Sequence, residues 1–289
     1  MALAPKIAVI APTRAILGES PFWDSHRNCL WWVDIDGGRL HRLDDDYHDS
    51  VVFEANEPLG SAIVKDNGTF ILALGKGLIE LDSFRNTSEL AVSPSGDRLN
   101  DAKCDPRGRL YVGSLTYDRT PGACALYRFS PSEGLVPVIA GVTLSNGMGW
   151  SPTGEEMYFI DTPTRTIMAY HYDLEEGRIG EGRVLVDFGE VPGNPDGMAV
   201  DSAGCIWVVM AKAGFLRRIS PSGETLEVIK LPTKFTTSCC FGGRDLDRLY
   251  ITSVTLKAGR PDPDEPFAGS IFALDPGVKG LKSEFWTGI

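Results

Sequence analysis

The chain repeats one pattern six times. A short apolar strand, a polar turn containing Gly or Asp and a second apolar strand recur at 21–35, 62–74, 102–114, 147–161, 197–210 and 239–253. The second strand of each unit carries a bulky residue, and these residues follow one another at intervals of 40 to 49 residues: Trp31, Ile71, Tyr111, Tyr158, Trp207 and Tyr250. Most units continue into a third strand. Six strand-rich repeats of this length are typical of a β-propeller. The sequence therefore predicts an all-β fold, a six-bladed β-propeller with four-stranded blades and a central channel.

A β-solenoid and a largely helical fold agree less well with the repeat. β-Solenoid repeats are usually shorter and lack these hairpin turns, and no window of a dozen residues has a helical apolar period, so few helices are expected. Closed all-β folds often reach this length as one domain, and residues 1–289 are predicted to form a single propeller domain. The leftover terminal segments, 6–12 and 282–288, are expected to close the ring by joining one blade.

Composition and charge exclude several classes of partner. The chain has 28 Lys and Arg against 39 Asp and Glu, a net charge of −11, and its basic residues form no cluster. Nucleic acid and anionic membranes are therefore not expected as partners. The N-terminal sequence lacks an apolar stretch long enough for a signal peptide or a membrane span, which predicts a cytoplasmic protein. Six cysteines show no CxxC spacing and lie mostly in apolar runs, so free thiols are expected.

Polar residues recur at one place in the repeat. The first strand of each blade lines the channel of a propeller, and counting back from each turn gives Glu19, Ser61, Asn100, Asn146, Asp196 and Ser238 as equivalent positions. Asn and Asp are depleted in strands, and a buried carboxylate without a partner is costly. Carboxylate and amide oxygens converging on one axis suit a divalent cation, with calcium, magnesium or manganese favoured over zinc. The alternative is that each residue only caps a strand end.

Six stretches of sequence carry a family resemblance: "LGESPFWD", "RLNDAKCDPRGRLYVGS", "LSNGMGWS", "PDGMAVDSAGCIWV", "TTSCCFGGRDLDRLYITS" and "GVKG". In this order, from about residue 17 to 280, the chain resembles the regucalcin and gluconolactonase family, also called senescence marker proteins, which includes bacterial sugar lactonases. The resemblance implies a six-bladed propeller that holds one divalent metal ion in its channel and hydrolyses lactones of sugar acids.

The resemblance also assigns roles to individual residues. Glu19, Asn146 and Asp196 match the family's metal ligands. Asn100 matches a residue beside the metal that meets substrate or a metal-bound water, and Arg98 matches one that grips substrate hydroxyls. Calcium is the favoured ion, and zinc, manganese, magnesium and iron stay open because members of the family have been described with several metals.

One loop departs from the family pattern. Animal members usually follow the third-blade strand with Gly-Thr-Met, a nearby acidic residue that helps to bind sugar hydroxyls, and a long loop. This chain continues instead through Tyr117 and Asp118 into a short "RTPGA". The acidic residue has no clear match, so the identity of the substrate does not transfer directly.

The expected chemistry is hydrolysis of a lactone. A divalent metal polarises the carbonyl and can acidify a bound water, and Asp196 is the carboxylate best placed by register to act as base. Arg98 and Asn100 would position ring hydroxyls. The four histidines, His26, His41, His48 and His171, lie away from the channel register, which argues against a Ser-His-Asp hydrolase. Two alternatives stay open: a calcium-binding regulatory propeller without catalysis, and a metal-dependent hydrolase of organophosphates.

Overall fold

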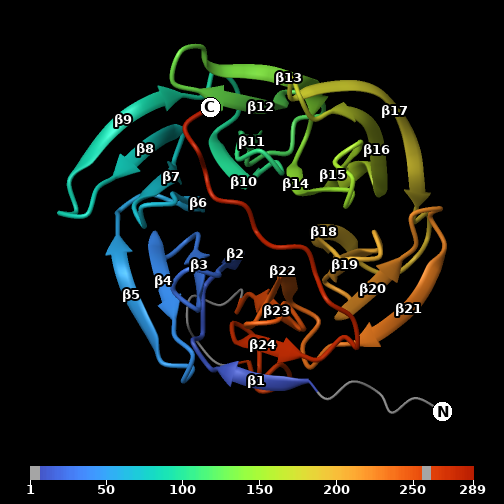
Figure 1. Ribbon diagram of the computed structural model, residues 1–289. Helices are drawn as coiled ribbons and strands as arrows, with labels where there is room; N and C mark the ends of the chain where they lie inside the picture. The colour runs from blue at the N-terminus through green and yellow to red at the C-terminus, as the bar shows by residue number, and fades with distance from the viewer. Residues whose placement is uncertain (1–6, 256–261) are drawn as a thin grey trace.

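The computed structural model describes residues 7–255 and 262–289. In these residues the chain forms six four-stranded antiparallel sheets that stand around a common axis as the blades of a propeller (Figure 1). In five of the blades the strands follow one another in chain order from the axis to the rim. The predicted all-β six-bladed architecture is confirmed, and η1 (Thr162–Thr164), a 3-10 helix, is the one helical element within the described ranges.

The blades are numbered along the chain. Blades 1 to 3 comprise β2 (Gly18–Asp24), β3 (Cys29–Asp34), β4 (Arg39–Leu43) and β5 (Asp49–Glu54); β6 (Leu59–Val64), β7 (Phe70–Leu74), β8 (Gly77–Leu81) and β9 (Thr87–Val92); and β10 (Arg98–Cys104), β11 (Leu110–Leu115), β12 (Cys124–Ser130) and β13 (Gly134–Val142). Blades 4 to 6 comprise β14 (Ser145–Trp150), β15 (Glu156–Asp161), β16 (Thr166–Asp173) and β17 (Arg178–Asp187); β18 (Asn194–Val200), β19 (Ile206–Ala211), β20 (Phe215–Ile219) and β21 (Thr225–Lys230); and β22 (Thr236–Gly242), β23 (Arg248–Ser253), β24 (Ile271–Leu274) and β1 (Ala8–Ala11).

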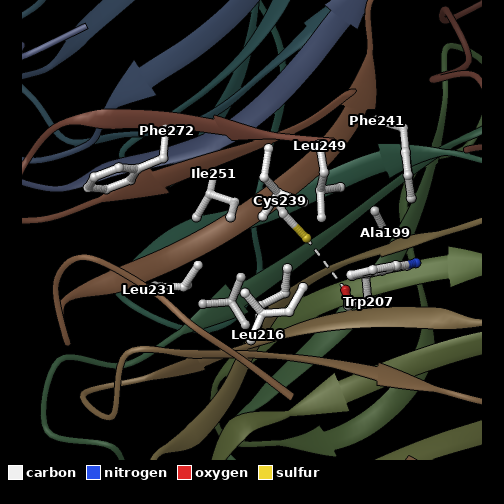
Figure 2. Close-up of a cluster of buried hydrophobic side chains, with 12 residues drawn as sticks. Ala199, Trp207, Leu216, Leu231, Cys239, Phe241, Leu249, Ile251 and Phe272 are labelled. Atoms are coloured by element: carbon white, nitrogen blue, oxygen red, sulfur yellow. Dashed lines mark hydrogen bonds between the residues drawn. The ribbon is translucent and has the colours of Figure 1, made fainter. Parts of the chain in front are cut away.

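Burial follows the distance of a strand from the axis. The innermost strands β6, β14 and β22 are buried at every residue, whereas the rim strands β5 and β9 are exposed or half-buried at every residue. Neighbouring blades pack face to face through apolar clusters. Figure 2 shows the cluster between blades 5 and 6, in which Trp207 and Leu216 face Phe241, Leu249 and Phe272. Packing of both blade faces is the main stabilising term of such a ring, because it removes large apolar areas from water.

The two ends of the chain close the ring in different ways. Strand β1 pairs with β24, so the N-terminal segment supplies the rim strand of blade 6, as predicted for 6–12 in its described part. The prediction for 282–288 was wrong, because this segment adds no strand to a sheet and makes only an isolated bridge between Trp286 and Lys65. It crosses the ring instead (Figure 1), and backbone amides of Leu281, Trp286 and Thr287 donate to carbonyls in blades 5, 2 and 3. The C-terminal segment thus covers the channel at the end where the innermost strands finish.

Every innermost strand contains a bulge near its start. The register shifts by one residue at Ser20–Pro21, Gly60–Ser61, Asn100–Asp101, Asn146–Gly147, Asp196–Gly197 and Thr237–Ser238. The first bulge position therefore unites Asn100, Asn146 and Asp196, as the sequence predicts. Ser61 and Ser238 occupy the second position and Glu19 precedes its bulge by one residue, so for these three the predicted equivalence was wrong. A bulge adds a residue that hairpin counting cannot register.

The innermost strands approach one another closely at these bulges. A Cβ on Gly147 would lie 2.5 Å from the carbonyl oxygen of Asp196, and a Cβ on Gly197 would lie 2.0 Å from the hydroxyl oxygen of Ser238. Larger residues would push the strands apart, so glycine is required for the channel to be this narrow.

Two expectations from composition can be compared with the structure. All six cysteines are free and buried, as predicted. Among residues 7–255 and 262–289, no helix has the length and hydrophobicity that a membrane crossing requires.

Three hairpin turns between first and second strands are held by buried aspartates, Asp24, Asp105 and Asp201. In blade 5 one carboxylate oxygen of Asp201 accepts the amides of Ala203 and Cys205, both at 2.9 Å. The other oxygen accepts Trp207 Nε1 at 3.1 Å and the Arg218 guanidinium at 2.7 and 2.9 Å. The carboxylate satisfies five donors in a site closed to water, so its removal leaves a half-buried cation and buried N–H groups unpaired.

We expect Asp201→Ala to lower the free energy of unfolding by about 3 to 5 kcal/mol, because one partner of a buried ion pair is removed. Urea titration followed by tryptophan fluorescence measures the change. Asp82→Ala is the matched control, since Asp82 also caps a turn through backbone amides but lies at the surface. Equal losses in the two variants would contradict the role given to the buried pair.

Candidate functional site

The side chains that converge on the axis come from the starts of the innermost strands, and we call this end of the channel the mouth. The bulges of β10, β14 and β18 place Asn100, Asn146 and Asp196 there. Glu19 reaches the same region from one residue earlier in β2. The next residue, Ser20, has a left-handed backbone with φ of 49°, and its amide donates to Glu19 Oε2 at 3.0 Å.

A continuous chain of hydrogen bonds links blades 3, 4 and 5 at the mouth. Arg98 Nη1 donates to Asn100 Oδ1 at 2.6 Å, and Asn100 Nδ2 donates to Asn146 Oδ1 at 2.8 Å. Asn146 Nδ2 donates to Thr162 Oγ1 at 2.7 Å, and that hydroxyl donates to Pro195 O at 2.8 Å. Arg98, Asn100 and Asn146 are buried. The network fixes both amide planes, and the carbonyl oxygen of Asn146 keeps one lone pair beyond its bond to Asn100.

Three carboxylates share this region: Glu19, Asp101 and Asp196. Burial raises the pKa of Glu19 well above its ordinary value, and repulsion from Asp196 and Asp101 raises it further. Burial raises the pKa of Asp196 to about 8, with Asp101 again contributing, and burial likewise raises the pKa of Asp101. The three residues belong to blades 1, 3 and 5, so only the axis of the ring brings their charges together.

These carboxylates lack cationic partners in the described part of the chain. None of the ion pairs there involves Glu19, Asp101 or Asp196, and the nearby Arg98 acts on Glu19 without a direct bridge. Asp101 is buried and Glu19 and Asp196 are half-buried, and like charges crowded in such a site call for a cation. No group of three or more His, Cys, Asp and Glu side chains in the described residues can hold a metal ion by itself. A hard divalent ion at the mouth would therefore need amide oxygens in addition to carboxylate oxygens.

The sequence analysis missed Asp101. The signal was present, because "RLND" places an acidic residue directly after Asn100, but in a regular strand adjacent side chains point to opposite faces. The bulge at Asn100–Asp101 interrupts this alternation, so the two adjacent side chains no longer have to point to opposite faces. Ser61 and Ser238, which share the position of Asp101 in their own blades, are also buried, and the Ser61 hydroxyl has no hydrogen-bond partner among the described residues.

The loop after β11 differs from what the family resemblance implies. The carboxylate of Asp118 accepts the amide of Thr120 at 3.0 Å and its hydroxyl at 2.8 Å, so it caps its own turn. Tyr117 is 63% exposed, and its amide donates to the carboxylate of Asp97 at 2.7 Å. The Asp118 carboxylate is therefore engaged by its own turn in this structure.

Comparison with known proteins gives consistent results. Residues 17–255 match the family model described as the SMP-30/Gluconolactonase/LRE-like region. The chain is 37% identical to a 6-deoxy-6-sulfogluconolactonase of Pseudomonas putida over 95% of this chain and 96% of the relative. It is 36% identical to a pentonolactonase of Haloferax volcanii, with 94% of both chains covered, and 31% identical to regucalcin of Gallus gallus, with 96% of both covered. A solved structure titled a calcium-binding protein, regucalcin, from Agrobacterium tumefaciens superposes with a TM-score of 0.89 at 25% identity, covering 99% of this chain and 100% of that one.

We expect Glu19→Gln to raise the melting temperature of the metal-free protein. A carboxyl group with a raised pKa stays protonated to a higher pH in the folded state than in the unfolded state. The unfolded carboxyl ionises at about pH 4. Between that pH and the raised pKa, the contribution of Glu19 to stability therefore falls as pH rises. The variant should exceed wild type at pH 8 by about 2 °C for each kcal/mol of repulsion removed, and the difference should shrink at pH 5.

Scanning calorimetry in the presence of a chelator measures this difference. Glu89→Gln removes an exposed glutamate from the rim strand β9 and serves as the control with no pH-dependent gain. A Glu19→Gln protein that is less stable than wild type at pH 8 would contradict the crowding of charge at the mouth.

Proposed function

Since the chain belongs to the SMP-30/gluconolactonase/LRE-like family, we propose that it is an enzyme that hydrolyses the lactone ring of a sugar acid. The observation that carries the proposal is the mouth itself, where carboxylates from blades 1, 3 and 5 meet a fixed chain of amide side chains. The names of two relatives, a sulfogluconolactonase and a pentonolactonase, support the same substrate class. Six unpaired thiols suit a reducing compartment, and we place the reaction in the cytoplasm.

We infer that Glu19, Asn146 and Asp196 hold one divalent ion, since these side chains provide hard oxygen donors and two negative charges that are otherwise unpaired. Calcium suits such donors best, with magnesium, manganese, zinc and iron as alternatives. When bound, the ion supplies a Lewis acid that polarises the lactone carbonyl. Its charge also offsets the repulsion between the two carboxylates.

Side chains of the protein carry out the other tasks of the reaction, which are activation of water and positioning of the substrate. The reaction adds water across the acyl–oxygen bond, which yields a hydroxyl and a carboxylic acid that then loses its proton. Asp196 orients the attacking water and accepts a proton from it. Arg98 and Asn100, fixed to each other by a 2.6 Å hydrogen bond, bind ring hydroxyls and so hold the carbonyl in place. The guanidinium of Arg98 is buried beside the carboxylates, where it can donate hydrogen bonds to the substrate and hold it in position.

The second candidate is a calcium-binding regulatory role, which the names of the regucalcin relatives favour. Such a protein would use the same ligands. It would have no need for a buried arginine at the mouth, whose own pKa is lowered by burial and which opposes the binding of a cation. The position of Arg98 therefore favours catalysis on a polar substrate. A metal-dependent organophosphate hydrolase remains a third possibility, since a phosphoryl oxygen can be polarised in the same way.

A panel of sugar lactones tested with several divalent ions distinguishes these functions. We expect at least one lactone to be hydrolysed, with the activity lost on chelation and restored by added metal. A phosphotriester should be a much poorer substrate. Tight calcium binding without turnover of any lactone would favour the regulatory role, and preferential cleavage of the phosphotriester would favour the organophosphate hydrolase.

Asp196→Asn tests the role in proton transfer. The substitution keeps the size and one ligand oxygen while removing the charge, so activity at saturating metal should fall by about 10² to 10⁴, the usual contribution of a positioned base. Asn146→Ala should act mainly through metal affinity, and excess metal should restore much of its activity. If both variants recover fully with added metal, Asp196 is a ligand only. Steady-state rates measured across a metal titration separate the two effects.

A further inference from the structure

Two basic residues at the mouth have no role in the site described so far. Arg119 lies in the turn after β11, and the pairing of Leu115 with Arg98 brings this turn beside the substrate-positioning arginine. Lys212 directly follows β19, whose last residue, Ala211, pairs with Asn194 at the start of the strand that carries Asp196. The two cations therefore extend from blades 3 and 5, on either side of blade 4.

Electrostatic effects on the site agree with this placement. Burial lowers the pKa of Arg98, and Arg119 lowers it further, as expected for two like charges close to each other. Lys212 approaches the same end of the channel from blade 5, because the preceding residue, Ala211, pairs with Asn194, two residues before Asp196.

Neither side chain makes a hydrogen bond or an ion pair with any described residue, and both are exposed. Many other surface arginines are paired: Arg39 with Glu54 at 2.8 Å, Arg128 with Glu133 at 3.1 Å and Arg178 with Asp173 at 3.2 Å. At Arg119 and Lys212 the charge is left available to a ligand.

The overall charge makes this local arrangement informative. A chain with a net charge of −11 repels anions at long range, so an anionic substrate needs cations close to the point where it enters. Three cationic residues, the buried Arg98 and the exposed Arg119 and Lys212, belong to strands and turns at the mouth end of blades 3 and 5. Arginine binds planar or tetrahedral oxyanions through two parallel hydrogen bonds, and lysine adds a point charge.

We propose that the lactone carries an oxyanion, a sulfonate, phosphate or carboxylate group, at the end remote from the ring carbonyl, and that Arg119 and Lys212 bind this group. The inference rests on the proposed lactonase function and specifies its substrate class. In this arrangement Arg98 and Asn100 bind the ring hydroxyls near the axis, while the oxyanion points outward between the turns of blades 3 and 5. The exposed pair sets specificity by charge and leaves the reacting end of the lactone to the buried residues.

The test compares glucono-δ-lactone with lactones of the same ring that carry a 6-phosphate, a 6-sulfonate or a 6-carboxylate. The metal-loaded wild type should prefer at least one anionic lactone in kcat/KM. In Arg119→Gln and in Lys212→Gln, the ratio of anionic to neutral kcat/KM should fall about 3- to 10-fold each, mainly through KM, as expected for a partly solvated charge contact. Added salt should raise KM for the anionic lactone and have little effect on the neutral one.

Two matched controls keep the result specific. Arg85, in the turn between β8 and β9, is exposed, has a left-handed backbone with φ of 65° and lies away from the axis, and Lys230 ends the rim strand β21 (Figure 1). Arg85→Gln and Lys230→Gln should leave the ratio unchanged. A wild type that prefers the neutral lactone, or site variants in which both kinds of lactone lose activity equally, would overturn the inference. A wild type that opens no lactone would instead contradict the proposed function.

Discussion

The bulge that interrupts each innermost strand determines what the mouth can do. In a regular strand, adjacent residues point to opposite faces, so one blade could offer the axis only every second side chain. The bulge places an extra residue opposite a single partner and changes the direction of the side chains around it. In β10 this brings Asn100 and Asp101 to the same site, and in blades 4 and 5 it requires glycine after Asn146 and Asp196. The narrow ring and the polar axis both follow from this one irregularity.

The carboxylates crowded near the axis destabilise the metal-free protein. Three carboxylates with raised pKa values repel one another in a site that is partly shielded from water, and a relaxed chain would separate them. The ring prevents this, since each carboxylate is attached to a buried strand packed between two other blades. Closure by β1 and the C-terminal segment that crosses the far end of the channel add to this rigidity. The cost of crowding these charges is therefore offset by apolar packing elsewhere in the fold.

Charge is also graded along the path to the site. The protein surface is acidic as a whole, the turns of blades 3 and 5 carry unpaired cations, and the axis carries carboxylates next to a buried arginine. A cation is attracted to the axis, whereas an anionic group is stabilised only near the rim of the mouth. This separation fits a substrate with a polar reacting end and a distinct charged end, because the two ends meet different electrostatic environments.

The sequence by itself determined the six blades, because a strand–turn–strand unit with a buried bulky residue repeats in the printed order of residues. It also identified Asn100, Asn146 and Asp196 as equivalent, since all three stand at the same distance from their hairpin turns. Other features of the site depend on tertiary structure and cannot be found by counting residues from the turns. The position of Glu19 and the arrival of Asp101 depend on bulges, which alter the register without a marker in the sequence. The place of residues 281–288 across the channel depends on acceptors in blades 2, 3 and 5 that come together only once the ring has formed. The placement of Arg119 and Lys212 at the same end of the channel likewise depends on the ring, because the two residues belong to different blades.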